Sequence, residues 1–284
     1  MSPAPADDGK ALTAAPGDSA LTAAAGAIVL TASHLGVVPY REGLALQEAL
    51  ARARAAGETG DWLLFPDHPP VLTVGRSGDP ASLRADPETL ARLGIEVFEV
   101  ARGGDVTWHG PGQLVGYPIL DLERRGRDLH RFLRDLEELL LGALGRFGIE
   151  GRREAGRTGV WVGGAKIASI GVAVRRWVSY HGFALNVAPD LGFFDLIHPC
   201  GLRGIRMTSV AALLGARVPS LAEMRETVAR EAARRFGCES VVWAASEEAW
   251  RHASGARGSP RPGGDCRDGP SGMESTRVPA AGAI

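Results

Sequence analysis

The alternation of apolar and polar residues predicts one ordered domain between two low-complexity ends. Apolar side chains recur at helical or strand spacing between residues 27 and 245. Residues 1–26 are rich in Ala, Pro, Gly and Thr, and residues 246–284, above all those after about 252, are rich in Gly, Pro and Ser. Because such ends lack the periodic apolar residues that build a core, we expect disordered N-terminal and C-terminal tails.

Helices are predicted wherever the apolar residues form one stripe. Residues 128–147 carry Leu, Phe and Ala at i, i+3, i+4 and i+7 spacing, and Asp128 is suited to cap that helix. A shorter stripe covers residues 41–55, and Asp86-Pro87 begins a short helix that ends at Gly94. Ser220 and Glu223 form a capping box ahead of a last helix that ends near Gly237.

Strands are predicted between these helices. Gly163-Gly164 has the positive φ preference of a two-residue hairpin turn and joins two apolar segments. The predicted strands cover residues 27–32, 62–65, 71–74, 95–100, 158–162, 165–174 and 177–187. The fold class expected over roughly 27–245 is α+β, with a mixed, largely antiparallel sheet covered by helices.

Composition and charge narrow the classes of partner. A chain of 284 residues with 45% hydrophobic residues can bury a large core. A formal net charge of -1 gives no general attraction to nucleic acid or to an anionic membrane, so we expect neither partner. No apolar run approaches the roughly 18 residues that span a bilayer, and Asp7 and Asp8 stand where a secretory signal carries basic residues. The expected location is cytoplasmic.

Cys200 is the candidate nucleophile. The three cysteines, Cys200, Cys238 and Cys266, form no CxxC pair and are expected to be free thiols, of which Cys238 is expected to be inert. Pro199 and Gly201 flank Cys200 and favour an irregular backbone, which would hold its sulfur outside regular structure. The alternative is that Cys200 is a small buried apolar residue.

Lys166 is the candidate partner of that thiol. Of the 32 Lys and Arg residues only Lys10 and Lys166 are lysines, and Lys10 lies in a predicted tail. A reactive thiolate needs a stabilising cation, and an amine can also exchange a proton whereas a guanidinium cannot. Chance survival of one lysine remains open.

Histidine could replace that lysine in a Cys-His arrangement. The three candidates are His109, His181 and His198, which all lie in Gly-rich or Pro-rich segments. His198 is two residues from Cys200 and is expected to point elsewhere in an extended segment. His109 and His181 could instead be loop histidines that backbone hydrogen bonds hold.

Residues 102–113, RGGDVTWHGPGQ, are too dense in glycine for a helix or a central strand. Glycine lets a backbone approach a ligand closely, so a binding loop is the functional interpretation, and a long turn is the alternative. The segment contains neither a phosphate-binding GxxxxGK[ST] nor a GxGxxG motif.

Four segments together resemble one known family. They are RGGDVTWHGPGQLVGYPILDL (102–122), TGVWVGGAKIASIG (158–171), SYHGFALNV (179–187) and IHPCG (197–201). In this order they resemble the lipoyl(octanoyl) transferase family, over about residues 34–240. The resemblance implies a fold similar to the biotin and lipoate protein ligase catalytic domain.

The resemblance also implies a reaction and its partners. Octanoyl would pass from acyl carrier protein to apo lipoyl domains, those of 2-oxoacid dehydrogenase complexes and of the glycine cleavage H protein, without cofactor or metal. An ATP-dependent lipoate ligase and a non-catalytic carrier-binding protein are the alternatives. A nucleophilic cysteine favours the transferase, because neither alternative needs one.

The resemblance assigns roles to residues by motif. Cys200 would carry the acyl thioester and Lys166 would lower the pKa of its thiol. The substrate-binding residues would be Arg102, Gly103, Gly104, Asp105, Val106, Thr107, Trp108, His109, Ser169, Ile170, Gly171, Gly182, Phe183 and Ala184. Asp105 stands where the family commonly has glutamine, and Trp108 where tyrosine is common.

Overall fold

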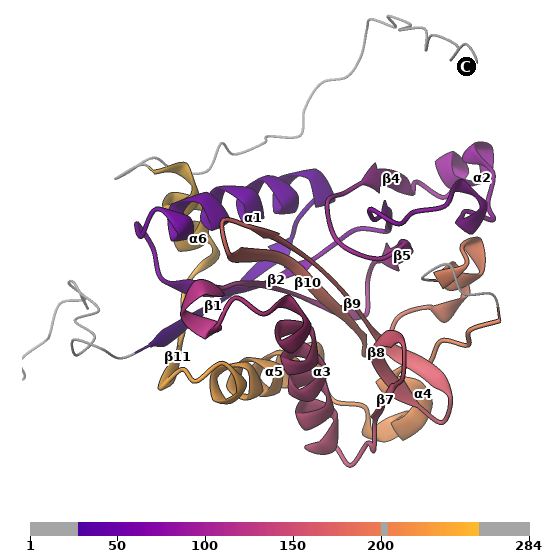
Figure 1. The fold of residues 1–284 in the computed structure, drawn as a ribbon. Coiled ribbons are helices and arrows are strands. Elements are labelled where there is room, and N and C mark those ends of the chain that lie inside the picture. The colour runs from indigo at the N-terminus through magenta and orange to yellow at the C-terminus, as the bar shows by residue number, and fades with distance from the viewer. Residues whose placement is uncertain (1–27, 200–203, 256–284) are drawn as a thin grey trace, which may run out of the picture.

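Two β-sheets organise the part of the chain that the computed structural model describes, residues 28–199 and 204–255 (Figure 1). The larger sheet has, in spatial order, β11 (Ser240–Trp243), β1 (Val29–Val37), β2 (Asp61–Asp67), β6 (Gln113–Ile119), β10 (Val178–Asn186), β9 (Ala165–Arg175), β8 (Arg157–Val162) and β7 (Arg152–Glu154). The smaller sheet has β4 (Glu96–Glu99), β3 (Val71–Val74) and β5 (Val106–His109).

The larger sheet is mixed. Strand β1 runs parallel to both β11 and β2. Every other neighbouring pair in this sheet is antiparallel. The predicted fold class, α+β with a mixed and largely antiparallel sheet, is confirmed.

Helices cover both faces of the larger sheet (Figure 1). Helices α1 (Tyr40–Ala55) and α6 (Ser246–Ser254) lie on one face, and α3 (Leu129–Gly145) and α5 (Leu221–Arg235) lie on the other. The alternation in β2 follows from this layering, since Trp62 and Leu64 pack toward α1 while Leu63 and Phe65 pack toward α3 and α5. Because helices cover both faces of the sheet, both faces of β2 carry apolar side chains.

Short elements complete the path around the smaller sheet. They are α2 (Pro87–Arg92), α4 (Val210–Leu214) and the 3₁₀ turns η1 (Pro80–Ser82), η2 (Glu123–Arg125), η3 (Leu191–Leu196) and η5 (Gly215–Arg217). Residues of α2, β3, β5 and η3 share a separate apolar cluster that includes Leu72, Leu90, Trp108 and Phe194. This cluster joins the smaller sheet to the segment that precedes Cys200.

The helix signals read from the sequence are confirmed. The carboxylate of Asp128 accepts a hydrogen bond from the Arg131 N–H at the start of α3. Ser220 and Glu223 form the reciprocal capping box of α5. In the hairpin, Gly163 and Gly164 both have positive φ, at 56° and 77°, as a primed turn requires.

Several predicted boundaries are wrong. Strand β1 continues to Val37 rather than ending at 32, and β10 begins at Val178 because Arg176 and Trp177 form a turn with positive φ. The segment predicted to contain no helix or central strand supplies β5, which is an edge strand of the smaller sheet, and its last residue, Gln113, begins β6 inside the larger sheet.

Helix α6 corrects the predicted C-terminal tail. Residues 246–254 form a helix that packs on α1, with Ala249 fully buried and Trp250 and Ala253 against the same cluster. Three apolar side chains at i, i+1 and i+4 are enough for docking onto an existing core, although they are too few for a stripe that predicts a helix. The predicted tails at 1–26 and beyond 255 lie outside the described residues.

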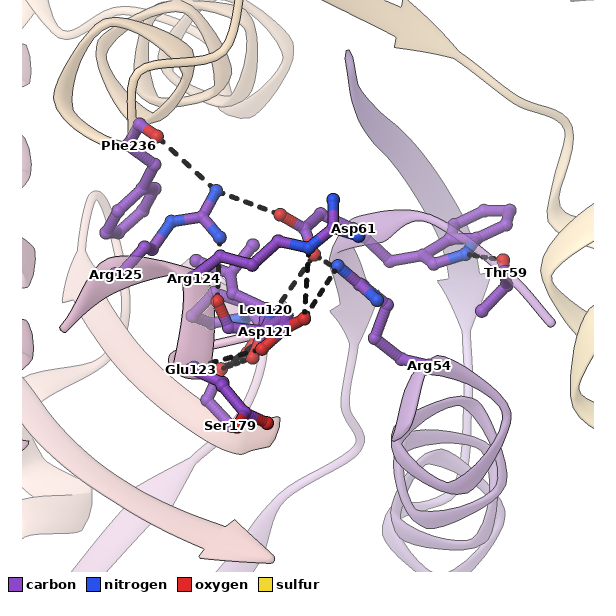
Figure 2. A network of polar contacts seen from close by, with 12 residues as sticks. Arg54, Thr59, Asp61, Leu120, Asp121, Glu123, Arg124, Arg125, Ser179 and Phe236 are labelled. Atoms are coloured by element: carbon purple, nitrogen blue, oxygen red, sulfur yellow. Dashed lines mark hydrogen bonds and ion pairs between the residues drawn. The ribbon is translucent and has the colours of Figure 1, made fainter. Parts of the chain in front are cut away.

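A buried ionic network ties α1 to the end of β6 (Figure 2). Asp61 accepts hydrogen bonds from Arg54 Nε at 2.7 Å and lies 2.9 Å from Arg125 Nη2. Arg54 also pairs with Asp121, whose carbonyl accepts from Arg125 Nη1. Arg125 further donates to the carbonyl of Phe236 at the end of α5. The carboxylate of Asp61 thereby connects elements on both faces of the sheet.

Removing that carboxylate is expected to destabilise the fold strongly. In Asp61→Ala, two largely buried guanidinium groups lose one carboxylate acceptor each, and breaking a buried ion pair costs about 3–5 kcal/mol of unfolding free energy. Urea denaturation measures the difference. Glu226→Ala, which breaks an exposed pair with Arg230, is the matched control and should change little. Equal losses in both variants would contradict a structural role for the network.

Candidate active site

One pocket lies between the smaller sheet and strands β9 and β10. It has about 460 Å³ of empty space, part of it at the open mouth. Its lining residues are Tyr40, Arg102, Gly103, Gly104, Val106, Thr107, His109, Tyr117, Ser169, Ile170, Gly171, His181, Gly182, Phe183 and Ala184. Three segments far apart in the sequence therefore meet at one place.

A close backbone crossing forms the mouth of this pocket. The Gly103 N–H donates to the carbonyl of Val172, so residues 102–104 cross directly over β9. A Cβ atom on Gly171 would lie 2.8 Å from the Gly103 carbonyl oxygen and 3.1 Å from Arg102 Cδ. Only a residue without a side chain permits this approach. The glycines of the two motifs are thus matched to each other.

Arg102 fixes the loop from within. Its guanidinium donates to the Thr73 carbonyl at 2.6 Å, to Thr73 Oγ1 at 2.8 Å and to the Gly103 carbonyl at 3.1 Å. Its side chain lines the pocket while only 7% of the residue is exposed. A buried cation at this position favours a polar or anionic group of a ligand near the mouth.

Twelve of the fourteen predicted substrate-binding residues line the pocket. The two others face away from it. Trp108 is fully buried and stacks on Phe193, with ring centroids 5.0 Å apart, so it supports η3 instead. Asp105 accepts hydrogen bonds from Ser82 and from the Asp79 N–H. Alternation along β5 places Trp108 on the face opposite to Thr107 and His109, whereas Asp105 precedes the strand and its side chain is held by Ser82 and Asp79.

The ionisable groups deep in the pocket are held neutral. Burial, with the charge of Arg102 as a smaller cause, lowers the pKa of His109 and of His181 to about 3 each. Burial also raises the pKa of Tyr40 to about 12 and holds that of Tyr117 well above its usual range. Between Arg102 and the floor, the pocket therefore carries polar groups without charge at neutral pH.

A chain of hydrogen bonds fixes the tautomer of His109. The carbonyl of Thr208 can only accept, so Asn186 Nδ2 donates to it at 3.0 Å. Asn186 Oδ1 then accepts from Gln113 Nε2 at 2.9 Å, and Gln113 Oε1 faces His109 Nδ1 at 3.2 Å. In the neutral ring Nδ1 carries the proton, which leaves Nε2 as an acceptor.

His181 has an unusual backbone. Its φ is 56°, in the left-handed region that a residue with a Cβ adopts rarely, and its N–H donates to Gln47 Oε1 at 2.8 Å. Its Nε2 is buried and has no hydrogen-bond partner among the described residues. Both His109 and His181 lie on strands, so the alternative that they are loop histidines is wrong, while the predicted strand 177–187 that contains His181 is confirmed.

Lys166 lies on β9, three residues before the pocket-lining Ser169, and is 2% exposed. Its Nζ lies 5.5 Å from the centre of the Trp161 ring, as in a cation–π contact. A Cβ on Gly159, where φ is 128°, would lie 2.6 Å from Lys166 Cε, so the glycine leaves room for the lysine stem. The backbone of Lys166 pairs with Arg206 and Thr208.

Cys200 itself lies outside the described residues, whereas the segments on both sides are described. A hollow is bounded by Ala165, which precedes Lys166 in the chain, and by Pro199, Gly204 and Arg206. Residues 206–208 pair with the backbone of Lys166, so the segment that begins six residues after Cys200 in the sequence lies beside the lysine. Cys266 also lies outside the described residues, and burial raises the pKa of the Cys238 thiol, as an inert cysteine requires.

Sequence reasoning did not assign Tyr40, Tyr117 or His181 to the pocket. Tyr117 donates to His68 Nε2, whose Nδ1 faces the Val38 carbonyl, so this ring is also a fixed neutral tautomer. Burial lowers the pKa of His68 to about 4. In sequence these aromatic residues look like ordinary core positions, and only the close approach of α1, β6 and β10 brings them together.

Two absences hold within the described part of the chain. No helix there is long and apolar enough to cross a membrane. Nor are any three histidine, cysteine or acidic side chains of residues 28–199 and 204–255 grouped as metal ligands are.

Comparison with known proteins identifies the family of this chain. The model of the Lipoyl protein ligase A/B catalytic domain matches residues 39–233. An octanoyltransferase of Geobacter metallireducens is 54% identical over 69% of this chain and 88% of its own length. An octanoyltransferase of Rubrobacter xylanophilus is 52% identical over 68% of this chain and 87% of its own.

Solved structures agree on the fold. A lipoate-protein ligase A bound with ATP superposes with a TM-score of 0.65 and 20% identity, over 81% of this chain and 93% of its own. A bi-partite lipoate protein ligase from Thermoplasma acidophilum gives 0.59 and 17%, over 81% and 91%. The fold is that of a lipoyl protein ligase A/B catalytic domain. Within this class, the chain belongs to the octanoyltransferase family and is an enzyme.

Proposed function

We propose that this enzyme transfers octanoyl from acyl carrier protein to a lysine of apo lipoyl domains through a thioester on Cys200. The acceptors would be the lipoyl domains of 2-oxoacid dehydrogenase complexes and the glycine cleavage H protein. The observation that carries the proposal is the position of Lys166 on β9 between two hollows. It lies three residues before Ser169, which lines the pocket of the glycine-rich loop, and directly after Ala165, which lines the hollow of the segments that flank Cys200. A reduced nucleophilic thiol suits a cytoplasmic location.

The first step exchanges one thioester for another. The Cys200 thiolate attacks the acyl carbonyl carbon, the bond from that carbon to the carrier sulfur breaks, and the carrier leaves as a thiol after it takes a proton from Lys166. Both bonds are thioesters, so the step is nearly isoenergetic and needs no nucleotide. Lys166 is suited to this role because an amine can release a proton that a guanidinium keeps.

The second step forms the amide. The lysine amine of the lipoyl domain attacks the thioester carbon, the carbon–sulfur bond to Cys200 breaks, and Lys166 accepts the proton that the amine loses. The enzyme returns to its starting state with a Cys200 thiolate and a protonated Lys166. Because the acyl group stays on the enzyme between the two carriers, the kinetics should be ping-pong.

The pocket is suited to the acyl chain. Val106, Ile170, Phe183 and Ala184 supply apolar walls, and the floor is closed by side chains that stay neutral. Arg102 at the mouth is suited to the polar end of the ligand. An octanoyl chain would thus lie with its tail inward, and the loop of residues 102–104 would cover it.

Intact mass spectrometry tests the thioester directly. After mixing with octanoyl acyl carrier protein without ATP, the enzyme should gain one octanoyl group, which hydroxylamine removes. Cys200→Ala should gain none, because the nucleophile is lost. The matched control is Cys238→Ala, which removes a thiol of raised pKa and should be acylated as the parent is.

The same measurement separates the alternatives. An ATP-dependent ligase would gain no acyl mass from the carrier, because its acyl adenylate is held without a covalent bond, but it would release pyrophosphate once ATP and free acid are added. A carrier-binding protein would neither gain acyl mass nor release pyrophosphate. An octanoyl adduct that persists in Cys200→Ala would show that another residue is the nucleophile.

A further inference from the structure

Asp105 belongs to the glycine-rich motif but points away from the pocket. Its carboxylate is buried, with 7% of the residue exposed. Oδ2 accepts a hydrogen bond from Ser82 Oγ at 2.5 Å, and Oδ1 accepts one from the Asp79 N–H at 3.1 Å. Both oxygens of a buried carboxylate therefore hold the same short segment, the 3₁₀ turn η1.

That segment is joined to the backbone that leads into Cys200. The carbonyl of Ser82 accepts from the His198 N–H at 2.7 Å. The carbonyl of Leu196 accepts from the N–H groups of Arg84 and Ala85, and Leu83 pairs with Ile197 in an antiparallel bridge. His198 is two residues before Cys200 in the sequence.

Ser82 thus contacts both the loop that lines the pocket and the segment that precedes Cys200. Its hydroxyl belongs to the pocket loop through Asp105, and its carbonyl belongs to the Cys200 segment through His198. Only 4% of Ser82 is exposed, so water cannot replace either partner. A hydrogen bond from a hydroxyl to a carboxylate is roughly twice as strong as one between neutral groups. The Ser82–Asp105 contact is therefore stronger than the Ser82–His198 contact.

We propose that Asp105 is a positioning residue, which acts through Ser82 to hold the backbone before Cys200 in register with the substrate loop. The inference rests on the proposed function, in which Cys200 is the nucleophile. Arg102, Gly103 and Gly104 on one side of Asp105 and Val106 on the other line the pocket. The same loop that contacts the acyl group would therefore also locate the atom that attacks it.

The chemistry of the connection explains why a carboxylate is suited to this position. Asp79 N–H and Ser82 Oγ both donate, so the residue at 105 has to accept twice in a buried site. A neutral amide has only one accepting oxygen and would turn its other end, a donor, toward one of them. Asp105→Asn thus keeps the volume and removes one of the two acceptors.

Three variants of the full chain test the proposal: Ser82→Ala, Asp105→Asn and the double variant. Two rates are measured, single-turnover acylation of Cys200 by octanoyl acyl carrier protein and alkylation of Cys200 by iodoacetamide across pH. The control is Ser179→Ala, which removes a fully buried hydroxyl that joins β10 to the end of β6. Ser179→Ala should lower thermal stability and leave both rates at Cys200 unchanged, if a general loss of packing has no effect on Cys200.

We expect Ser82→Ala and Asp105→Asn each to lower the maximum acylation rate by roughly 10- to 100-fold, the scale of a small misplacement of reacting groups. The KM for the carrier should change little, and the pH profile of alkylation should shift. The double variant should be no slower than Ser82→Ala alone, because Asp105 acts through that hydroxyl. Ser82→Thr, which keeps the hydroxyl, should recover most of the rate.

Other outcomes overturn the inference. Acylation and alkylation at the parent rates in Ser82→Ala, or losses no larger than those of Ser179→Ala, would show that the contact only stabilises the fold. Strictly additive losses in the double variant would show that Asp105 does not act through Ser82. Failure of the proposed function is distinguishable, since the parent enzyme would then take no octanoyl while alkylation of Cys200 still reports the positioning.

Discussion

Lys166→Arg is expected to lower octanoyl transfer by about 10²-fold or more, the usual scale of general acid–base catalysis. Arginine keeps a positive charge at position 166 but stays protonated at any working pH, so it could not give a proton to the carrier thiol or take one from the incoming amine. The variant therefore separates charge stabilisation of the thiolate from proton transfer.

Lys166 is tightly enclosed, so the size of the side chain at this position matters as well as its charge. The side chain is 2% exposed, with the Trp161 ring on one side and the Cα of Gly159 against its stem. A forked guanidinium is larger than an ammonium, so some of the loss could arise from geometry. Lys166→Met, similar in length and uncharged, is the matched control.

Two measurements on both variants separate these effects. Iodoacetamide labelling of Cys200 against pH reports the thiolate, and Lys166→Arg should keep more of a lowered thiol pKa than Lys166→Met. The steady-state rate of octanoyl transfer reports proton transfer by residue 166, and both variants should lose this rate. Near-normal transfer by Lys166→Arg would show that the lone lysine of the domain has another role.

The sequence predicted an element correctly where the signal for it depends only on residues that are close together in the chain. The stripe of α3, the capping box of α5 and the Gly163-Gly164 turn depend on neighbours within a few residues, so the sequence carries them in full. Strand β6 was missed because Gly116 and Pro118 are unfavourable in a central strand. Tertiary packing overrides that preference, since a Cβ on Gly116 would meet the Phe183 ring of β10.

In the pocket, too, the sequence predicted the residues that lie within continuous motifs and missed those that only tertiary packing brings together. The motifs predicted twelve of the residues that line the pocket, because each motif is a continuous segment whose residues reach the pocket together. Trp108 and Asp105 were predicted to bind substrate, yet their side chains face Phe193 and Ser82. Tyr40 came from a helix more than sixty residues away, and no local pattern predicts such a meeting.

Acidification from pH 6.5 to 5 is expected to destabilise the fold by an unusually large amount. Burial lowers the pKa of His68 to about 4 and those of His109 and His181 to about 3, whereas in the unfolded chain a histidine has a pKa near 6.5. As the pH falls, the unfolded state therefore binds protons first. The stability that these neutral rings contribute is complete above pH 6.5 and is lost as the pH falls toward 4 and 3.

The size of the loss follows from the same linkage. Each ring should remove about 2 kcal/mol of unfolding free energy between pH 7 and pH 5, because protonation of the folded state lags by several pH units. Three such rings would consume a large share of the roughly 5–15 kcal/mol that stabilises a typical domain. Urea denaturation at pH 7.5, 6.0 and 5.0 measures the slope.

His68→Gln tests the assignment of one ring. Glutamine loses the fixed contacts to Val38 and Tyr117, so stability should fall at every pH, but the further loss between pH 7 and pH 5 should shrink by about 2 kcal/mol. His130→Gln, at an exposed position on α3, controls for the removal of one histidine. An unchanged slope in His68→Gln would mean that this ring is protonated without unfolding, in a pocket that admits water beside it.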